Sequence, residues 1–286
     1  MFLYYQMILY HYRRLMKITF IKAHGAGNDF VIIDKNVDIV KKSKKIIKKL
    51  CDRRFGIGCD QLILLKKYPS YHRVYFYNSD GSLGKNCGNG LRCVYKYLSE
   101  TKKYKEVVIK SHNFNHLGSK VGKDYKINVG EVSLDWKKIP LSKKMDTQNI
   151  FLKNIKIPGV IKIMSASIGN PHCVVLVKNI NSIDLEKLGP KLVKHSLFPN
   201  QANITFVEKI NSRSIKVLFW ERGGGHTLAC GSGTCATAFV LYHNNLVETK
   251  IKIKTEQSFL ETDIQGKMVY LKGPAEIVYQ SVIQIL

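Results

Sequence analysis

The sequence lacks the patterns that mark several common classes of protein. It contains no Cys-x-x-Cys pair, which excludes a thioredoxin-like redox motif, and its cysteine spacings are not those of zinc knuckles. Neither a P-loop nor a dinucleotide-binding glycine fingerprint is present. No low-complexity tract occurs. The apolar segment at residues 1–15 is too short to span a membrane and lacks the charge order of a secretory signal.

Acidic residues are scarce, with 21 Asp and Glu against 46 Lys and Arg, which gives a formal net charge of +25. Such a charge raises the question of nucleic acid or an anionic membrane as a partner. The lysines are spread along the chain, and no zinc finger, aromatic RNA-binding signature or helix-turn-helix accompanies them. The densest run, residues 41–49, has a helical pattern that favours a solvated helix face over a phosphate-binding stripe. We therefore expect neither a nucleic acid nor a membrane partner.

The length and the strand-like runs predict a two-domain α+β protein. A chain of 286 residues with 45% hydrophobic residues suits two domains of ordinary size. Helical segments are few, chiefly residues 40–50, 91–97 and 234–242. Predicted strands include residues 18–21, 31–33, 74–77, 173–177, 204–207, 215–220, 251–253 and 268–271. Seven cysteines in no secreted-type framework favour a reducing cytoplasm.

An internal repeat is the most informative feature of the sequence. Short motifs of the first half recur in the second half in the same order and at a nearly constant separation. The paired residues are Asn28 with Asn170, Gln61 with Asn203, Asn78 with Glu221, and Cys87 with Cys230. A duplicated domain places equivalent residues across a pseudo-two-fold cleft. Two cysteines related in this way suit a reaction on both faces of one carbon.

Each of these two cysteines begins a Cys-Gly-x-Gly turn that leads into an apolar helical segment. Glycines let the backbone approach a ligand closely, and the free N–H groups of a helix N-terminus attract anions such as carboxylates. The same field lowers the pKa of a thiol, so we expect thiol and thiolate both to be accessible near neutral pH. Cys51, Cys59, Cys93, Cys173 and Cys235 are interpreted as small packing residues.

The motifs taken together resemble those of the diaminopimelate epimerase family. They extend over residues 16–279 and are highly specific to that family. They are HGAGNDF (24–30), GCDQ (58–61), NSDGS (78–82), CGNGLRC (87–93), GNPH (169–172) and ERG (221–223) leading to TLACG (227–231).

The resemblance implies an isomerase that interconverts LL- and meso-2,6-diaminopimelate on the route to lysine and peptidoglycan. It implies two similar domains related by pseudo-two-fold symmetry, each a β-barrel-like sheet around a central helix, with the site between them. We expect domains at 16–134, joined by 274–286, and at 135–273, preceded by a poorly ordered extension at 1–15. The reaction of the family uses neither a metal nor pyridoxal phosphate, so no cofactor is expected. We also expect a cytoplasmic homodimer that forms through the region around Tyr279.

The resemblance also carries roles for individual residues. Cys87 and Cys230 form the acid and base pair, with His172 and Glu221 as further catalytic residues. Glu221 suits either an ammonium group or the tuning of a thiol, and Arg222 suits a distal carboxylate. The expected substrate contacts are Asn28, Gln61, Asn78, Gly88, Asn89, Asn170, Asn203, Glu221, Arg222, Gly231 and Ser232.

Two alternatives remain open at this point. A proline-type racemase or hydroxyproline epimerase is also built on two cysteines, although Arg222 and the extra amides favour a longer substrate. A basic nucleic-acid-binding protein with structural cysteines is the alternative outside enzymes, and salt-dependent binding to DNA or RNA would distinguish it.

Overall fold

The computed structural model describes residues 16–84, 87–101, 103–104, 107–112 and 114–285. The extension expected at residues 1–15 lies outside this part of the chain. The elements of the first half are β1 (Met16–Gly25), β2 (Asn28–Ile33), α2 (Val37–Lys41), α3 (Lys44–Cys51), β3 (Gln61–Lys67), β4 (His72–Asn78), α4 (Gly88–Lys96), the π-helix η1 (Tyr97–Thr101), β5 (Val108–Ser111), β6 (Phe114–Val121) and β7 (Asp124–Glu131).

The second half is organised in the same manner. Its elements are β8 (Val160–Ser167), β9 (Pro171–Val177), the 3-10 helix η2 (Ile180–Ser182), α5 (Leu185–Val193), β10 (Asn203–Asn211), β11 (Ser214–Glu221), β12 (Gly225–Thr227), α6 (Gly231–His243), β13 (Lys250–Lys254), β14 (Phe259–Gln265), β15 (Met268–Gly273) and β16 (Glu276–Ile285). No helix in the described part of the chain is both long and apolar enough to cross a bilayer.

The repeat seen in the sequence is confirmed by the strand pairing. In the first half β2 is parallel to β3, β3 is antiparallel to β4, and β4 is parallel to β5. In the second half β9, β10, β11 and β13 repeat the same three pairings in the same order. In both halves the helix that begins at the Cys-Gly-x-Gly turn lies between the third and fourth of these strands in the chain. Each half is therefore one copy of the same supersecondary unit.

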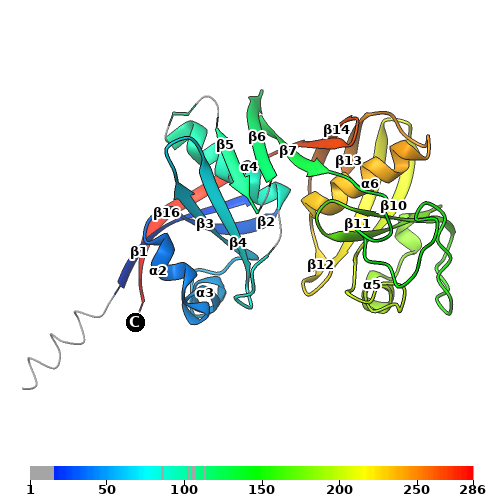
Figure 1. Ribbon diagram of the computed structural model, residues 1–286, viewed down its shortest axis with the longest axis horizontal. Helices are drawn as coiled ribbons and strands as arrows, with labels where there is room; N and C mark the ends of the chain where they lie inside the picture. The colour runs from blue at the N-terminus through cyan, green and yellow to red at the C-terminus, as the bar shows by residue number, and fades with distance from the viewer. Residues whose placement is uncertain (1–15, 85–86, 102, 105–106, 113, 286) are drawn as a thin grey trace, which may run out of the picture.

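The strands form one continuous path that curls around two helices. Its order is β16-β1-β2-β3-β4-β5-β6-β7-β15-β14-β13-β11-β10-β9-β8, and β12 pairs with β11 outside this path. The strands of the first half surround α4 and those of the second half surround α6 (Figure 1). The α+β class with two similar halves, each a curved sheet around a central helix, is confirmed. Among the described residues neither sheet closes into a barrel, because the path ends at β16 and at β8.

The two halves are joined at two places along this path. The antiparallel pair β7 and β15 connects the sheet of one half to the sheet of the other. The last strand, β16, then returns to the first half and pairs along β1, from Ile285 beside Met16 to Glu276 beside His24. Figure 1 shows this return, with the C-terminal strand lying next to the N-terminal one. The C-terminal segment is thus part of the first sheet.

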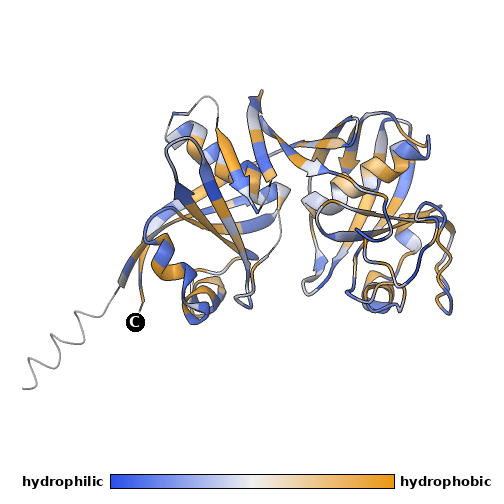
Figure 2. Cartoon of the chain, in the orientation of Figure 1, coloured by the Kyte–Doolittle hydropathy of each residue, from blue (hydrophilic) through white to orange (hydrophobic). Residues whose placement is uncertain are grey.

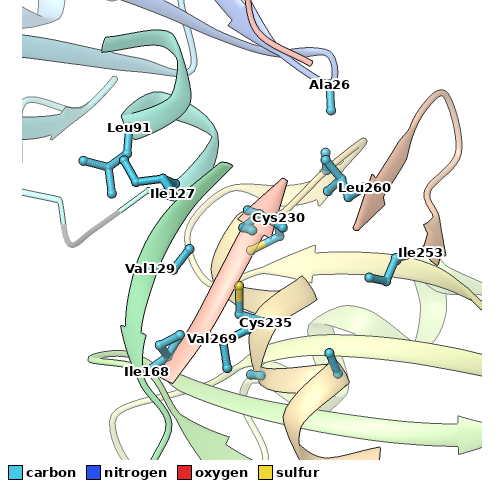
Figure 3. Packing of buried hydrophobic residues seen from close by; sticks show 14 of the residues in the cluster. Ala26, Leu91, Ile127, Val129, Ile168, Cys230, Cys235, Ile253, Leu260 and Val269 are labelled. Carbon is cyan, nitrogen blue, oxygen red and sulfur yellow. The ribbon is translucent and has the colours of Figure 1, made fainter. Parts of the chain in front are cut away.

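The central helix of the second half is buried along most of its length, and its buried residues are apolar or small. In α6 every residue from Gly231 to Leu241 is buried, and Figure 2 shows this helix as largely hydrophobic. Cys235 has no exposed surface and packs among apolar side chains such as Val269 near the start of the helix (Figure 3). An amphipathic pattern is absent from such a helix because no face meets water.

The lysine-rich segment forms a solvated helix face, as predicted, although it comprises two helices and not one. Ser43 interrupts the segment with an extended backbone and caps α3, because its Oγ accepts a hydrogen bond of 3.2 Å from the N–H of Ile46. Ile47 and Leu50 are buried while the lysines are exposed. Ile39 precedes the break and is 53% exposed, so it does not continue the apolar face.

The sequence did not predict α5. This helix contains Pro190 and Gly189, which argue against a helix in a pattern search. The glycine is required by packing, because a Cβ at Gly189 would lie 2.3 Å from the ring of Trp220. The close approach of Trp220 therefore decides the residue at this position.

Candidate active site

The two cysteines occupy equivalent positions in the two halves. Cys87 is the N-cap of α4 with φ −124° and ψ 109°, and Cys230 is the N-cap of α6 with φ −120° and ψ 107°. The carbonyl of Cys87 accepts from the N–H of Leu91, and the carbonyl of Cys230 accepts from the N–H of Thr234. Each sulfur therefore lies at the positive end of a helix dipole.

The two helix N-termini abut each other through glycines. A Cβ at Gly231 would lie 3.1 Å from the backbone nitrogen of Asn89 and 3.2 Å from Cα of Gly88. The side chain of Asn89 also crosses between the halves, where Nδ2 donates to the carbonyl oxygen of Ala229 at 3.3 Å. A residue larger than glycine at position 231 would separate the two turns. The glycines therefore allow both sulfurs to lie at the same junction.

A cavity of about 590 Å³ opens at this junction. It has polar walls and receives side chains from both halves. Among the residues predicted from the sequence, the structure places eleven on its lining: Asn28, Gln61, Asn78, Cys87, Asn170, Asn203, Glu221, Arg222, Cys230, Gly231 and Ser232. Gly88, Asn89 and His172 lie behind this surface.

The polar side chains of the first half are positioned by strand register and by hydrogen bonds. Gln61 and Asn78 are directly opposite on β3 and β4, and Nε2 of Gln61 donates to Oδ1 of Asn78 at 2.9 Å. Asn28 begins β2, and its Oδ1 accepts from Sγ of Cys87 at 3.5 Å. These amides therefore line one wall of the cavity beside the first thiol.

The second half presents a similar wall. Oδ1 of Asn203 accepts from the backbone N–H of Arg222 at 2.9 Å, which fixes the turn after β11. Nδ2 of Asn170 donates to Oγ of Ser232 at 3.2 Å, and Nε2 of His172 lies 3.1 Å from Oδ1 of Asn170. His172 is fully buried, and burial lowers its pKa to about 3, so its ring is neutral. The histidine thus contacts Asn170 and not the cavity.

The thiol pKa values differ from the sequence prediction. Burial raises the pKa of Cys87 to about 12. Hydrogen bonds from the N–H groups of Gly90 and Asn89 lower this pKa, and the charge of Glu221 raises it. Burial followed by Glu221 also raises the pKa of Cys230 well above its usual value. The expected decrease in the pKa of these two thiols is therefore wrong for this structure. The loss of hydration destabilises a thiolate here more than the helix N–H groups stabilise it.

Glu221 is the acidic group whose charge acts on the second sulfur. Burial raises its pKa, while hydrogen bonds from Thr227 and Cys230 act in the opposite direction. Oγ1 of Thr227 donates to Oε1 of Glu221 at 2.8 Å, and the N–H of Gly233 donates to Sγ of Cys230 at 3.4 Å. The carboxyl group therefore sets the electrostatic environment of Cys230 and remains directed at the cavity.

Sequence reasoning missed several residues of the cavity wall. They are Cys51, Arg53, Cys59, Asp60, Ser79, Asp80, Leu83, Gly84, Gly223, Gly224, Thr227 and Ala229. Asp60 is the most informative of them, because it accepts from Nδ2 of Asn28 at 2.7 Å and from Nη2 of Arg53 at 2.7 Å. Its position beside Gln61 in the GCDQ motif was the signal available in the sequence.

This arrangement supplies two thiols, several amides, a carboxyl group and a guanidinium around one polar cavity. Thiols can exchange protons with a carbon acid, and the amides and guanidinium can bind an amino acid with charged groups. In the described residues no three His, Cys, Asp or Glu side chains gather as a set of metal ligands.

The fold is shared with solved structures of a probable proline racemase, a hydroxyproline epimerase and phenazine biosynthesis proteins. The chain superimposes on a hydroxyproline epimerase from Agrobacterium vitis with a TM-score of 0.69 and 12% identity, covering 95% of this chain and 92% of that one. It also matches a phenazine biosynthesis protein of the PhzF family from Enterococcus faecalis, with a TM-score of 0.67, 10% identity and coverage of 94% and 100%. At such identities the likeness concerns the fold alone.

The sequence comparisons are more specific. The family model for diaminopimelate epimerase matches residues 20–133 and 164–278. A diaminopimelate epimerase of Pelagibacter ubique is 41% identical over 91% of this chain and 96% of its own length. Another, of Acetivibrio thermocellus, is 35% identical over 94% and 99%. The chain belongs to the diaminopimelate epimerase family.

Proposed function

We propose that this protein is an isomerase that interconverts LL-2,6-diaminopimelate and meso-2,6-diaminopimelate, in the biosynthesis of lysine and of peptidoglycan precursors. The observation that carries the proposal is the pair of Cys-capped helices, α4 and α6, whose N-termini meet at one polar cavity. Membership of the family supports the choice of substrate.

In the proposed reaction the two sulfurs act on opposite faces of one α-carbon. A thiolate on one cysteine removes the α-proton and becomes a thiol, which leaves an enolate-like carbanion. The thiol of the other cysteine then donates its proton to the opposite face and becomes the thiolate. The carbon is inverted, the total number of protons is unchanged, and Cys87 and Cys230 have exchanged roles for the reverse reaction.

The helix N-termini supply the electrostatic stabilisation of this intermediate. Backbone N–H groups at Gly88, Asn89, Gly231 and Ser232 would donate to the α-carboxylate, on which the negative charge develops. Donors held in place before the reaction are worth on the order of 10²–10³ in rate each. The close approach of Gly231 to Gly88 and Asn89 supports the proposal that donors of both turns serve one carboxylate.

The remaining polar residues would hold the rest of the substrate. Arg222 suits the distal carboxylate, since a guanidinium can bind a carboxylate through two parallel hydrogen bonds. One of its nitrogens, Nη1, already donates to the carbonyl oxygen of Asn200 at 2.6 Å, which orients the guanidinium. We assign His172 a positioning role through Asn170, and Glu221 to a substrate ammonium group or to the tuning of Cys230. The other proposed contacts are Asn28, Gln61, Asn78 and Asn203.

We also propose the domain boundaries, the oligomeric state and the cellular compartment of the protein. Domains at 16–134 with 274–286 and at 135–273 agree with the pairing of β16 along β1. A homodimer through the region of Tyr279 is supported by the exposure of Val278, Tyr279 and Val282 on β16. All seven cysteines are free, which supports a reducing cytoplasm as the compartment.

The test is solvent deuterium incorporation at the α-carbon of pure LL-diaminopimelate, followed by mass spectrometry and chiral analysis without an added cofactor. Deuterium should enter as the meso isomer forms. Proline and hydroxyproline, tested in parallel, address the proline-type alternative, and exchange with those substrates but not with diaminopimelate would contradict the proposal.

A further inference from the structure

Arg53 holds two aspartates together at the edge of the cavity. It follows α3 and lines the cavity wall of the first half. Its guanidinium contacts Asp29 through two hydrogen bonds, from Nη1 to Oδ2 at 3.0 Å and from Nη2 to Oδ1 at 2.7 Å. Nη2 also donates to Oδ1 of Asp60 at 2.7 Å. The arginine therefore connects β2, on which Asp29 lies, with the residue directly before β3.

The two aspartates are also joined through their backbones. The N–H of Asp60 donates to Oδ1 of Asp29 at 2.9 Å, and the N–H of Asp29 donates to Oδ2 of Asp60 at 3.2 Å. Two carboxylates held this closely repel each other unless cations compensate for them. Lys22 pairs with Asp29, whereas in the described part of the chain Asp60 forms an ion pair with Arg53 alone. Arg53 is therefore the cation that keeps Asp60 in place.

The turn before β3 is shaped to admit the side chain of Arg53. Gly58 has a φ of +78°, and a Cβ there would lie 2.9 Å from Cα and 3.0 Å from Cγ of Arg53. Any other residue would displace the arginine and strain the backbone. Nζ of Lys22 donates to the carbonyl oxygen of Gly58, so both cations contact the same turn. Burial alone would raise the pKa of Asp29, but hydrogen bonds from Arg53 and Lys22 lower it below its usual value.

A line of hydrogen bonds leads from this cluster to the first sulfur. Oδ2 of Asp60 accepts from Nδ2 of Asn28 at 2.7 Å, and Oδ1 of Asn28 accepts from Sγ of Cys87 at 3.5 Å. Nδ2 of Asn89 donates to the same amide oxygen at 3.4 Å. An amide whose nitrogen is bound by a carboxylate presents its oxygen to the sulfur, where it accepts from the neutral thiol. The orientation of Asn28 therefore depends on where Asp60 is held.

We propose that Arg53 is a positioning residue for the reaction, which holds Asp60 so that the amide oxygen of Asn28 faces Cys87. The inference rests on the proposed function for its purpose, but its effect on the sulfur can be measured without substrate. Without Arg53 the side chain of Asp60, which is 44% exposed, would turn toward water and release the amide of Asn28. Direct binding of substrate by Arg53 is the alternative, since its side chain is 58% exposed and lines the cavity.

The first experiment measures the labelling of Cys87 by iodoacetamide at pH 8, followed by peptide mass spectrometry, in Arg53→Met, Asn28→Ala and the double variant. The labelling rate follows the thiolate fraction. Loss of the acceptor destabilises the neutral thiol, so Arg53→Met should label Cys87 about three- to tenfold faster than the wild type. In the Asn28→Ala background the same substitution should bring no increase, because the acceptor is already gone. Loss of a nearby cation by itself has the opposite effect, since it disfavours the thiolate.

Turnover of LL-diaminopimelate by the same variants is the second measurement. Arg53→Met should lower kcat about tenfold and change KM by less than about threefold, because the misplaced amide lies beside the reacting sulfur. Arg54→Met is the matched control, as it removes an exposed arginine that is adjacent in the chain and does not line the cavity. Its labelling rate and its kinetic constants should equal those of the wild type.

An equal increase of labelling in both backgrounds would overturn the proposal, because it would show a general loosening of the site. So would an unchanged labelling rate or a wild-type kcat in Arg53→Met. A rise in KM that persists in the Asn28→Ala background would assign Arg53 to the substrate instead.

A second variant and the wild type complete the test. If Arg53→Met does not fold, Arg53→Lys takes its place in the same comparison. An increase of about twofold is then expected, since an ammonium group does not hold two carboxylates in one fixed geometry. No increase in that variant would also overturn the proposal. If labelling changes as expected but the wild type does not epimerise diaminopimelate, the assignment of Arg53 stands and the proposed function fails.

Discussion

The thiol of Cys87 donates a hydrogen bond to Oδ1 of Asn28, with 3.5 Å between sulfur and oxygen. The amide nitrogen of Asn28 is held by Asp60 at 2.7 Å, and Arg53 donates to the other oxygen of the same carboxylate. Because a carboxylate can only accept, the amide nitrogen must face Asp60 and the amide oxygen must face the sulfur. Asp60 therefore decides which end of Asn28 meets Cys87.

We accordingly expect Asp60→Ala to reduce kcat/KM for LL-diaminopimelate about tenfold to 100-fold, since Asn28 would lose its fixed orientation. The protein should remain folded, because Asp60 is partly exposed in this network. Asp38→Ala is the control, as it removes a surface carboxylate paired with Lys66 and distant from the cavity lining. Equal activity of both variants would show that Asp60 does not orient the site.

Replacement of either capping cysteine should stop epimerisation. In Cys87→Ala and Cys230→Ala one face of the carbon loses its proton donor and acceptor, so conversion of the LL isomer should fall at least about 10³-fold. Both variants should fold, since alanine is tolerated sterically at these caps. Cys173→Ala serves as the comparison because Cys173 is buried in the core of the second half, away from the cavity. Full turnover by either capping variant is incompatible with the two-base mechanism.

The guanidinium of Arg222 should be needed for its geometry as well as for its charge. Arg222→Lys keeps the charge but loses the two parallel N–H donors, so we expect kcat/KM to decrease about tenfold, and Arg222→Ala about 100-fold. Arg213→Ala, which removes an exposed cation paired with Glu248, should keep wild-type kinetics. The kinetic constants of the three variants with LL-diaminopimelate test the assignment, and a fully active lysine variant would refute bidentate binding.

Two buried histidines should make the fold sensitive to mild acid. Burial lowers the pKa of His172 to about 3 and that of His116 to about 4, against 6.5 for the unperturbed group. The unfolded chain therefore binds more protons than the native one below pH 6.5. Each histidine should then lower the free energy of unfolding by up to about 1.4 kcal/mol per pH unit, as the pH falls toward the pKa of that histidine in the folded protein.

Urea unfolding at pH 7, 6 and 5 measures this slope directly. In His116→Gln the slope should decrease, because one of the two neutral histidines is gone. His243→Gln, at an exposed position, should leave the slope as it is in the wild type. A stability that stays constant between pH 7 and pH 5 would show that neither ring resists protonation in the native protein.

The sequence by itself determined the repeat, the fold class and the identity of the two capping cysteines. A Cys-Gly-x-Gly turn is formed by residues that are adjacent in the chain, so it can be predicted from the sequence. Its glycines are required because the two turns approach each other closely. Strands such as β9 and β11 were likewise predicted from short apolar runs. The wall residues Asn28, Gln61 and Asn203 were found because a motif keeps its spacing along the chain.

Only the tertiary structure decided the properties that depend on distant neighbours. The direction of the pKa shifts of Cys87 and Cys230 follows from how much water the packed halves exclude, which no local pattern contains. The position of the Arg92 side chain follows from the meeting of β1, β15 and α4 around the carbonyl oxygen of Pro274. Electrostatic energies depend on burial and on separation in space, and the chain brings these groups together only when its two halves close on each other.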